Sequence, residues 1–427
     1  MGQAIKTQSA VPKKQLQNAH YSNLLLKEKL VKRNGMHSFH RYFGKLIPAI
    51  PAFAIKNFTE PGDWVLDSFC GSGTTLLEAK NLDRNAHGVD INPLAVFTAR
   101  VKTTKLPEQD IVDALAHIKK DFTNDNTNYA DIDEPYCVNI NHWFKPHVKS
   151  DLLKLRHYIL AIDNAGVRDF FLASFSAFLR GVSNADPMHV FPGYSKRLRK
   201  LDAEGKRTIN VWKSFENAVK KRTTYMGVLP DNKAAIKVSL GTAKQLPSSI
   251  KKVKLIVINP PYISSIRYLE TMKLEMGWLG FIHNQQEYVD LDKHVIGTER
   301  FYKKDLGTTT HTGFEDLDQS IDRLMTQGHL KMAKVVSEYF HNMKASFQEM
   351  HRVLEPGGHI VIKISDSKVR TERISTHKLL VAMAEGLGMK TIACFKDDFE
   401  ANSRSLLTAR NSYSGIMNYD WILIFRK

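Results

Sequence analysis

This chain of 427 residues is poor in features that would mark it as secreted, membrane-bound or metal-binding. Its three cysteines, Cys70, Cys137 and Cys394, have no paired spacing, which argues against a disulfide framework and against a structural zinc site. No apolar run reaches the roughly 18 residues of a transmembrane helix, and no signal segment opens the chain. We therefore expect a cytoplasmic protein without a bound metal and without a membrane partner.

Acidic residues are also few for a chain of this size. There are 44 Asp and Glu against 61 Lys and Arg, which gives a formal net charge of +17. Such an excess indicates a polyanionic partner, although a well-solvated basic surface would have the same composition. The length and a hydrophobic fraction of 43% predict one globular domain with a large insertion, or two domains.

A glycine turn follows the first predicted strand. The apolar segment 64–67 ends at Asp67, and Gly71 and Gly73 lead into a helix whose first N–H groups would face a ligand. A second strand ends at Asp90, at about the 20-residue distance from which a carboxylate can bind ribose hydroxyls. The turn lacks the Gly-Lys-Ser/Thr ending of a triphosphate loop, and Thr75 replaces the third glycine of the dinucleotide fingerprint.

A rigid polar loop, Asn259-Pro260-Pro261-Tyr262, follows the apolar strand 253–258. The two prolines fix φ and remove backbone donors, so the carbonyl groups there can accept hydrogen bonds from an NH2 group. The tyrosine offers a ring for stacking. A plain strand-end turn, with Tyr262 as core filler, would have the same sequence.

Together these segments resemble the exocyclic-amine DNA methyltransferases of restriction-modification systems. Asp67 to Thr74 is similar to their S-adenosylmethionine loop, and the loop 259–262 to their target-base motif. The segment 39–48 resembles the one that covers the methionine end of the cofactor, and segment 352–364 a late turn and strand. The resemblance implies a Rossmann-like class I α/β fold: a mostly parallel seven-stranded sheet with an antiparallel last strand and a largely helical insertion.

The resemblance also implies site residues. Asn259 and the Pro260 carbonyl would accept hydrogen bonds from the target amine, Pro261 would stiffen the loop, and Tyr262 would stack on a base flipped out of the duplex. Thr242 occupies a position where relatives usually carry Asp near the adenine of the cofactor. Cys70 is expected to pack rather than react. The predicted cofactor-binding residues are His40, Phe43, Lys45, Asp67, Phe69, Cys70, Gly71, Gly73, Thr74, Asp90, Ile91, Thr242 and Asn259.

The pattern along the chain predicts three parts. Residues 1–36 form an N-terminal arm, of which residues 1–20 are expected to be flexible or exchanged with a partner chain. Residues 37–107 and 231–427 form the catalytic domain. Residues 108–230 form a mainly helical insertion. We expect a loop over 283–315, one long helix over 318–354, and closing strands at 389–396 and 420–426.

The insertion is the expected site of DNA target recognition. Within 195–222, basic residues far outnumber acidic ones, which favours contacts to phosphates over a plain solvated face. Double-stranded DNA is therefore the predicted partner, with a cognate restriction endonuclease as a candidate and a monomer or homodimer as the assembly. The predicted DNA-binding residues are Lys196, Arg197, Arg199, Lys200 and Arg207.

Several functions share these motifs. In the family that the chain resembles, Asn before Pro-Pro-Tyr favours adenine N6 over cytosine N4 as the target. An RNA methyltransferase would share both motifs but should carry an RNA-binding appendage at one end. A non-catalytic subunit would have lost residues such as Asp67 and Asn259. No Pro-Cys dipeptide ends a strand, which disfavours the covalent cysteine mechanism of cytosine-C5 enzymes.

Overall fold

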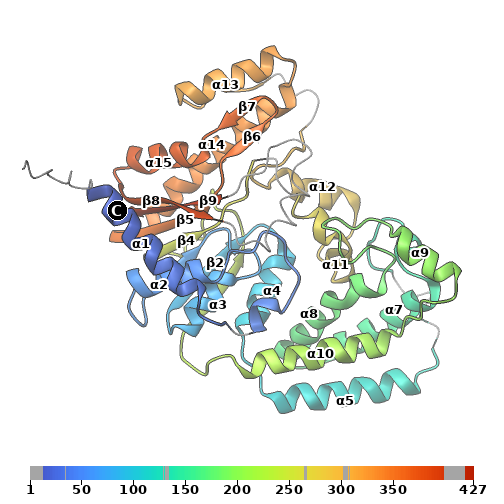
Figure 1. The fold of residues 1–427 in the computed structure, drawn as a ribbon. Coiled ribbons are helices and arrows are strands. Elements are labelled where there is room, and N and C mark those ends of the chain that lie inside the picture. Colours follow the sequence, from blue (N-terminus) through green and yellow to red (C-terminus); the bar gives the residue numbers. More distant parts are fainter. Residues whose placement is uncertain are drawn as a thin grey trace, which may run out of the picture.

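The computed structural model describes residues 13–33, 35–127, 129, 134–263, 267–301, 306, 308–398 and 419–427. Among these residues, seven strands form one sheet in the order β3-β2-β1-β4-β5-β9-β8 (Figure 1). Neighbouring strands are parallel except at β9, which is antiparallel to both β5 and β8. The predicted methyltransferase sheet is thus confirmed. Its strands are β1 (Trp64–Asp67), β2 (Asn85–Asp90), β3 (Ile236–Leu240), β4 (Val253–Ile258), β5 (Leu354–Ile364), β8 (Lys390–Asp398) and β9 (Tyr419–Arg426).

Helices cover both faces of the sheet. In β4, Leu255 and Val257 pack into the core on one face, and Ile256 and Ile258 into the core on the other. A strand buried on both faces reads as a continuous apolar run, which is why β4 is visible in the sequence. On the first face lie α2 (Ala49–Phe58), α3 (Thr74–Asn81) and part of α4 (Pro93–Thr103); on the second lie α14 (Leu330–Val353) and α15 (Thr376–Gly386).

The segment 108–230 is largely helical, as predicted, and its helices pack next to α4 at one side of the sheet (Figure 1). These helices share their hydrophobic core with residues from outside the segment. The same cluster takes in Phe39 from the segment before the sheet and Trp278 from the segment after β4, both fully buried. The helices that contribute to this core include α5 (Glu108–Asn124), α6 (Ile140–Trp143), α7 (Pro146–Leu160), α8 (Ala165–Val182), α10 (Val211–Gly227) and α11 (Lys273–Trp278), with the short 3₁₀ turns η1 (Gly35–Ser38) and η3 (Glu270–Met272). Helix α9 (Lys196–Ala203) belongs to the same segment but has no buried residue.

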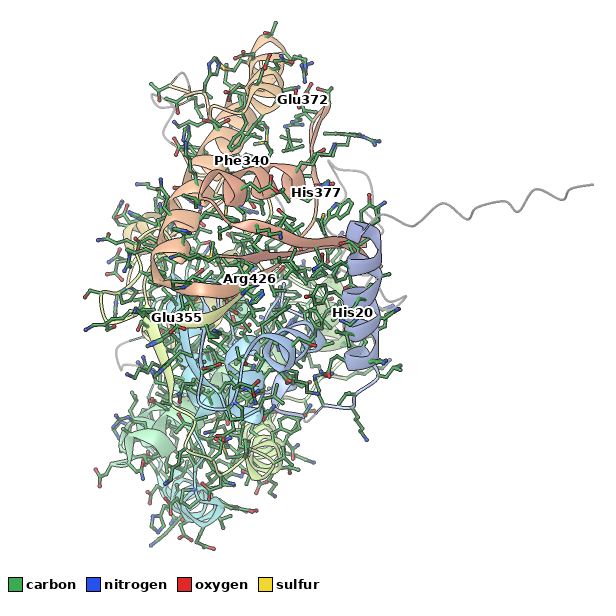
Figure 2. The ribbon with its side chains drawn as sticks, turned by 90° about the vertical axis from the view of Figure 1, so that its left-hand side faces the viewer. His20, Phe340, Glu355, Glu372, His377 and Arg426 are labelled. Carbon is green, nitrogen blue, oxygen red and sulfur yellow. The ribbon has the colours of Figure 1, made fainter. Side chains whose placement is uncertain are left out.

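The prediction of a flexible arm up to residue 20 is wrong for residues 13–20, because they belong to helix α1 (Lys13–Lys29). This helix, marked by His20 in Figure 2, stands against β8 and α2. Leu25 is buried, Lys29 forms an ion pair with Asp397, and the Asn18 side chain accepts a hydrogen bond from the backbone of Cys394. The helix therefore covers the outer strand of the sheet. Residues 1–12 lie outside the described part of the chain.

Three further elements differ from the prediction. The helix expected over 318–354 is divided at Gly328, which has φ of 78°, into α13 (Glu315–Thr326) and α14. The loop expected over 283–315 contains α12 (Gln285–Lys293), and a hairpin of β6 (Ser367–Val369) and β7 (Glu372–Ile374) precedes α15. Within the described ranges, no helix has the length and apolarity needed to cross a membrane.

Candidate active site

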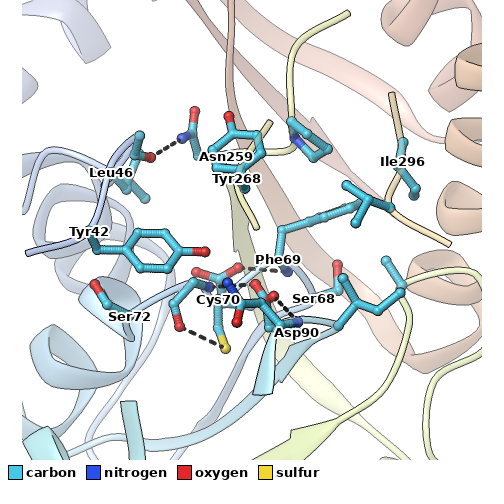
Figure 3. A pocket seen from close by; sticks show the side chains of 18 of the residues that line it. Tyr42, Leu46, Ser68, Phe69, Cys70, Ser72, Asp90, Asn259, Tyr268 and Ile296 are labelled. Atoms are coloured by element: carbon cyan, nitrogen blue, oxygen red, sulfur yellow. Dashed lines mark hydrogen bonds between the residues drawn. The ribbon is translucent and has the colours of Figure 1, made fainter. Parts of the chain in front are cut away.

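An open cavity lies at the carboxyl ends of β1, β2 and β4, where α/β sheets commonly bind ligands. Its empty space is about 870 Å³, including the part open to solvent. Figure 3 shows Tyr42 and Tyr268 above the glycine turn, with Asp90 at its floor. The cavity thus joins the segment before β1, both strand ends and the loop after β4. Of the predicted cofactor-binding residues, Lys45, Asp67, Phe69, Cys70, Gly71, Thr74, Asp90, Ile91, Thr242 and Asn259 line it.

The two glycines of the turn have different neighbours. Gly71 lines the cavity, and a Cβ there would lie 3.0 Å from the Tyr42 ring. Gly73 does not line the cavity; its φ is 77°, and a Cβ there would lie 2.8 Å from the Cβ of Ala99 in α4. Gly73 therefore lets α3 start close to α4, and the expectation that it binds the cofactor is not supported by its position. Thr74, the first residue of α3, does reach the cavity.

Two carboxylates hold this turn, Asp67, which is buried, and Asp90, which is half-buried. Asp67 accepts hydrogen bonds from the Thr75 hydroxyl at 2.6 Å and from the Phe69 N–H at 3.0 Å, and burial raises its pKa to about 7. Asp90 accepts from the N–H groups of Gly71 at 2.8 Å and Asn92 at 2.9 Å, and burial raises its pKa as well. Each carboxylate oxygen keeps a further acceptor position, so a bound hydroxyl or cation could still be satisfied there.

The cavity wall also contains polar atoms that lack a partner among the described residues. The hydroxyls of Ser68 and Ser72 are buried there without a hydrogen bond to any described part of the chain. A buried polar atom without a partner is costly, and a ligand with polar groups would remove that cost. Together with the Asp90 carboxylate and the Tyr42 ring, these atoms fit a nucleoside-containing cofactor. The Cys70 thiol is also buried, which raises its pKa, so it stays protonated and packs as expected.

Asn259 is the member of the Asn-Pro-Pro-Tyr loop that is best placed in the cavity. Its amide nitrogen donates to the Gly44 carbonyl at 3.0 Å (Figure 3). Its oxygen lies 3.4 Å from the Tyr262 hydroxyl. Pro261 also lines the cavity, whereas Pro260 and Tyr262 do not. The side chain is thus oriented, with its donor turned toward the segment before β1.

Tyr262 is positioned differently from the prediction. Its side chain belongs to the core behind the loop, and the residue is 8% exposed, so it presents no free ring face to the cavity. Its hydroxyl accepts a hydrogen bond from Lys363 at 3.0 Å and lies 3.2 Å from Asp420, and these two charged groups form a buried ion pair. In this conformation Tyr262 supports the loop from behind and is not set to stack on a base.

The segment before β1 contributes less to the cavity than expected. His40 is turned away from it toward α8, where Nε2 lies 2.9 Å from the Ser176 hydroxyl; burial lowers its pKa to about 3, so the ring is neutral. Phe43 is also absent from the cavity wall and packs under the Arg41 guanidinium at 4.6 Å. Lys45 does line the cavity; it donates to two backbone carbonyls, and burial lowers its pKa to about 8.

Several lining residues were missed in the sequence. Tyr42 lies within the segment 39–48, which was already expected to contact the cofactor. Ser68 and Ser72 lie within the glycine turn, next to residues that were predicted to bind the cofactor. Tyr268 and residues 294–296 carry no local signal, since only the fold brings them to the cavity. The missed residues are Tyr42, Gly44, Leu46, Ser68, Ser72, Asn92, Gly241, Ala243, Tyr268, Leu269, His294, Val295 and Ile296.

The predicted DNA-binding residues fall into two groups. Lys196, Arg197, Arg199 and Lys200 are exposed on α9, and we call them the α9 basic face. Arg207 does not belong to it. Its side chain is 9% exposed and bonds to Asp202 at 3.1 Å and to the backbone of Ser183, so its guanidinium is engaged within the protein, and its contact with DNA stays a prediction. No group of His, Cys, Asp and Glu able to hold a metal occurs in the described ranges.

Comparison with known proteins agrees with the motifs. Residues 5–100 match a family model described as DNA methylase. The type II methyltransferase M.MvaI of Kocuria varians is 24% identical over 371 residues, 80% of this chain and 79% of that protein. M.BsoBI of Geobacillus stearothermophilus is 21% identical over 85% of this chain and 80% of that protein. The structure of TrmN from Thermus thermophilus aligns with a TM-score of 0.32, 12% identity, and coverage of 93% of this chain and 55% of that chain.

Over most of its length the chain is similar to type II DNA methyltransferases, and residues 5–100 match the DNA methylase family model. With the glycine turn and the Asn-Pro-Pro-Tyr loop, this similarity supports an S-adenosylmethionine-dependent DNA methyltransferase of the exocyclic-amine type found in restriction-modification systems.

Proposed function

We propose that this enzyme methylates adenine N6 at a specific duplex DNA sequence, and that the target base is flipped into the cavity beside Asn259. The observation that carries the proposal is the position of Asn259, in the wall of the same cavity as Asp67 and Asp90. The cofactor supplies an activated methyl group on a sulfonium centre. The residues around it then need to align an amine with that centre, which is a task of positioning.

Asn259 is suited to hold such an amine. The amine lone pair is delocalised into the base, and acceptors on its hydrogens favour the tetrahedral nitrogen that can attack a methyl group. With its Nδ2 bonded to Gly44, Asn259 keeps Oδ1 as an acceptor. The Pro260 carbonyl is the second acceptor that we propose; because Pro260 does not line the cavity in this conformation, the contact would require the loop to adjust when the base enters. A base stacked in a duplex could not reach these atoms, so extrusion is part of the proposal.

The cofactor contacts are proposed from the geometry of the cavity. Asp90 would accept hydrogen bonds from the ribose hydroxyls, and Thr242, which lines the same cavity, would lie near the adenine. Asp67 would attract the positive charge of the methionine part. The α9 basic face would contact phosphates, and the segment 108–230 would recognise the target sequence.

One experiment tests both target and substrate. The purified enzyme is incubated with tritiated cofactor and either duplex DNA or bulk RNA, and the methylated nucleosides are identified by mass spectrometry. We expect N6-methyladenine from duplex DNA, and sequencing of DNA from expressing cells should reveal one recognition site. N4-methylcytosine would show that the other exocyclic amine is the target, and methylation of RNA alone would refute the proposal.

A further inference from the structure

The loop 185–194, which joins α8 to α9, exposes an apolar side chain at its tip. Met188 is 83% exposed. A solvent-facing methionine on a mobile loop would need no explanation. Here, however, hydrogen bonds fix the backbone on both sides of Met188, so its side chain projects into solvent from a fixed position.

The backbone around Met188 is fixed by one guanidinium. Arg41 donates from Nη1 to the carbonyl of Pro187 and from Nη2 to the carbonyl of His189 at 2.7 Å, the two residues that flank Met188. Arg180 donates to the next carbonyl, of Val190, at 3.2 Å. Bonds of this kind to charged donors are stronger than neutral ones. The tip of the loop is therefore tied to the body of the enzyme.

The base of the loop is closed as well. Ala185 and Tyr194 form an isolated β-bridge, and the Asp186 carboxylate accepts from the Met188 N–H and from the Ser195 hydroxyl, each at 2.9 Å. Ser195 in turn caps the first turn of α9 through a bond from the Leu198 N–H. The loop and the α9 basic face are thus one connected unit.

The loop lies beside the active-site cavity. Arg41 directly precedes Tyr42 in the chain, and the Arg267 guanidinium, which directly precedes Tyr268, lies 5.4 Å from the Phe191 ring. Tyr42 and Tyr268 both line the cavity. Two separate contacts therefore tie the loop to residues that directly precede two tyrosines of the cavity wall, and Ser195 joins the same loop to the α9 basic face.

We propose that Met188 enters the duplex at the target position and fills the space that the flipped base leaves. This inference rests on the proposed function. An unbranched thioether adapts its shape to an irregular gap, and apolar side chains inserted between base steps are a known way of opening a duplex. Arg41 acts as a positioning residue, because it holds the backbone from which Met188 projects.

The test compares Met188→Ala and Met188→Leu with the parent enzyme on two DNA substrates of the target sequence. In one the target base is paired; in the other it faces an abasic site, so that no pairing has to be broken. We expect Met188→Ala to lower the methylation rate on paired DNA by about tenfold or more, since unstacking is costly, and to approach the parental rate on the abasic substrate. Met188→Leu should keep most of the rate on both.

The matched control is Leu330→Ala, which removes a 41% exposed apolar side chain at the start of α14, on a different part of the molecule (Figure 1). It should behave like the parent on both substrates. Equal losses on paired and abasic DNA for Met188→Ala would mean that the residue contributes only to binding or stability, and unchanged rates would mean that it does not enter the duplex; either result overturns the inference. A parent enzyme that methylates no DNA would instead refute the proposed function.

Discussion

The buried ion pair behind the Asn-Pro-Pro-Tyr loop allows a quantitative prediction. Lys363 is 8% exposed and Asp420 is 1% exposed. Although burial alone would lower it, the attraction of Tyr262 and Asp420 raises the pKa of Lys363 above its usual value, so the lysine stays charged. In Lys363→Met the Asp420 carboxylate would remain buried without its cation. Removing one partner of such a pair typically costs about 3–5 kcal/mol, a large part of a total stability of about 5–15 kcal/mol.

The same substitution should also lower turnover. Lys363 donates to the Tyr262 hydroxyl at 3.0 Å, and that hydroxyl lies 3.4 Å from the Asn259 oxygen. Without Lys363, the Tyr262 hydroxyl should donate its proton to the unpaired Asp420 carboxylate. Asn259 would then lose the hydrogen bond from Tyr262 that helps to orient its side chain. We expect kcat to fall while the cofactor Kd is unchanged, because none of Lys363, Tyr262 and Asp420 lines the cavity.

The assay is urea unfolding of the parent, Lys363→Met and the double variant Lys363→Met with Asp420→Asn, followed by methylation kinetics. The double variant leaves no unpaired charge, so it should recover most of the lost stability. It should nevertheless keep a reduced kcat, because the donor to Tyr262 is still missing. If Lys363→Met stayed within about 1 kcal/mol of the parent with an unchanged kcat, the pair would neither stabilise the fold nor orient the loop.

Three more predictions concern the cavity and the DNA surface. Burial raises the folded-state pKa of Asp67 to about 7, above its unfolded value. The ligand-free protein should therefore lose stability as the pH rises from about 4 to 7. Because Asp67 becomes negatively charged over the same range, its affinity for the cationic cofactor should increase. Calorimetry at pH 6 and 8 checks this, and Asp67→Asn should remove the pH dependence. Replacing the four residues of the α9 basic face with alanine should reduce the slope of log affinity against log salt by roughly 0.9 per lost phosphate contact, with unchanged cofactor affinity; an unchanged slope would exclude this face from the DNA interface. Asn259→Ala should lower kcat by about a hundredfold while DNA and cofactor still bind, as measured by single-turnover kinetics, and full activity would show that Asn259 does not hold the target amine.

The parts of the fold that could be predicted are those with local causes. β1 and β4 are short apolar runs because both of their faces are buried, and the glycine turn needs positive φ at Gly71 and Gly73. These constraints act within a few residues, so the sequence displays them directly. The parallel sheet then brings the strand ends to one edge, which is why Asp67, Asp90 and Asn259 meet in one cavity.

The parts that could not be predicted depend on contacts between distant segments. Helix α1 has few apolar residues and looks like a polar arm, but Lys29 finds Asp397 and Asn18 finds the backbone of β8. The division of α13 from α14 depends on Gly328, although a single glycine lowers helix stability by only about 1 kcal/mol and does not by itself require a break. Tyr268 reaches the cavity only because the chain folds back there.

Residue type alone also could not separate function from support. Arg207 and Arg197 are both arginines in one basic stretch, yet Arg207 is bonded to Asp202 and Ser183 while Arg197 is exposed on α9. No local pattern in the sequence indicates the role of Arg41, because its two hydrogen bonds are made to the distant loop that carries Met188. A guanidinium whose N–H groups are bonded within the protein has fewer donors left for a phosphate. The partners of each cation, rather than the number of cations, therefore decide which part of this basic surface can meet DNA.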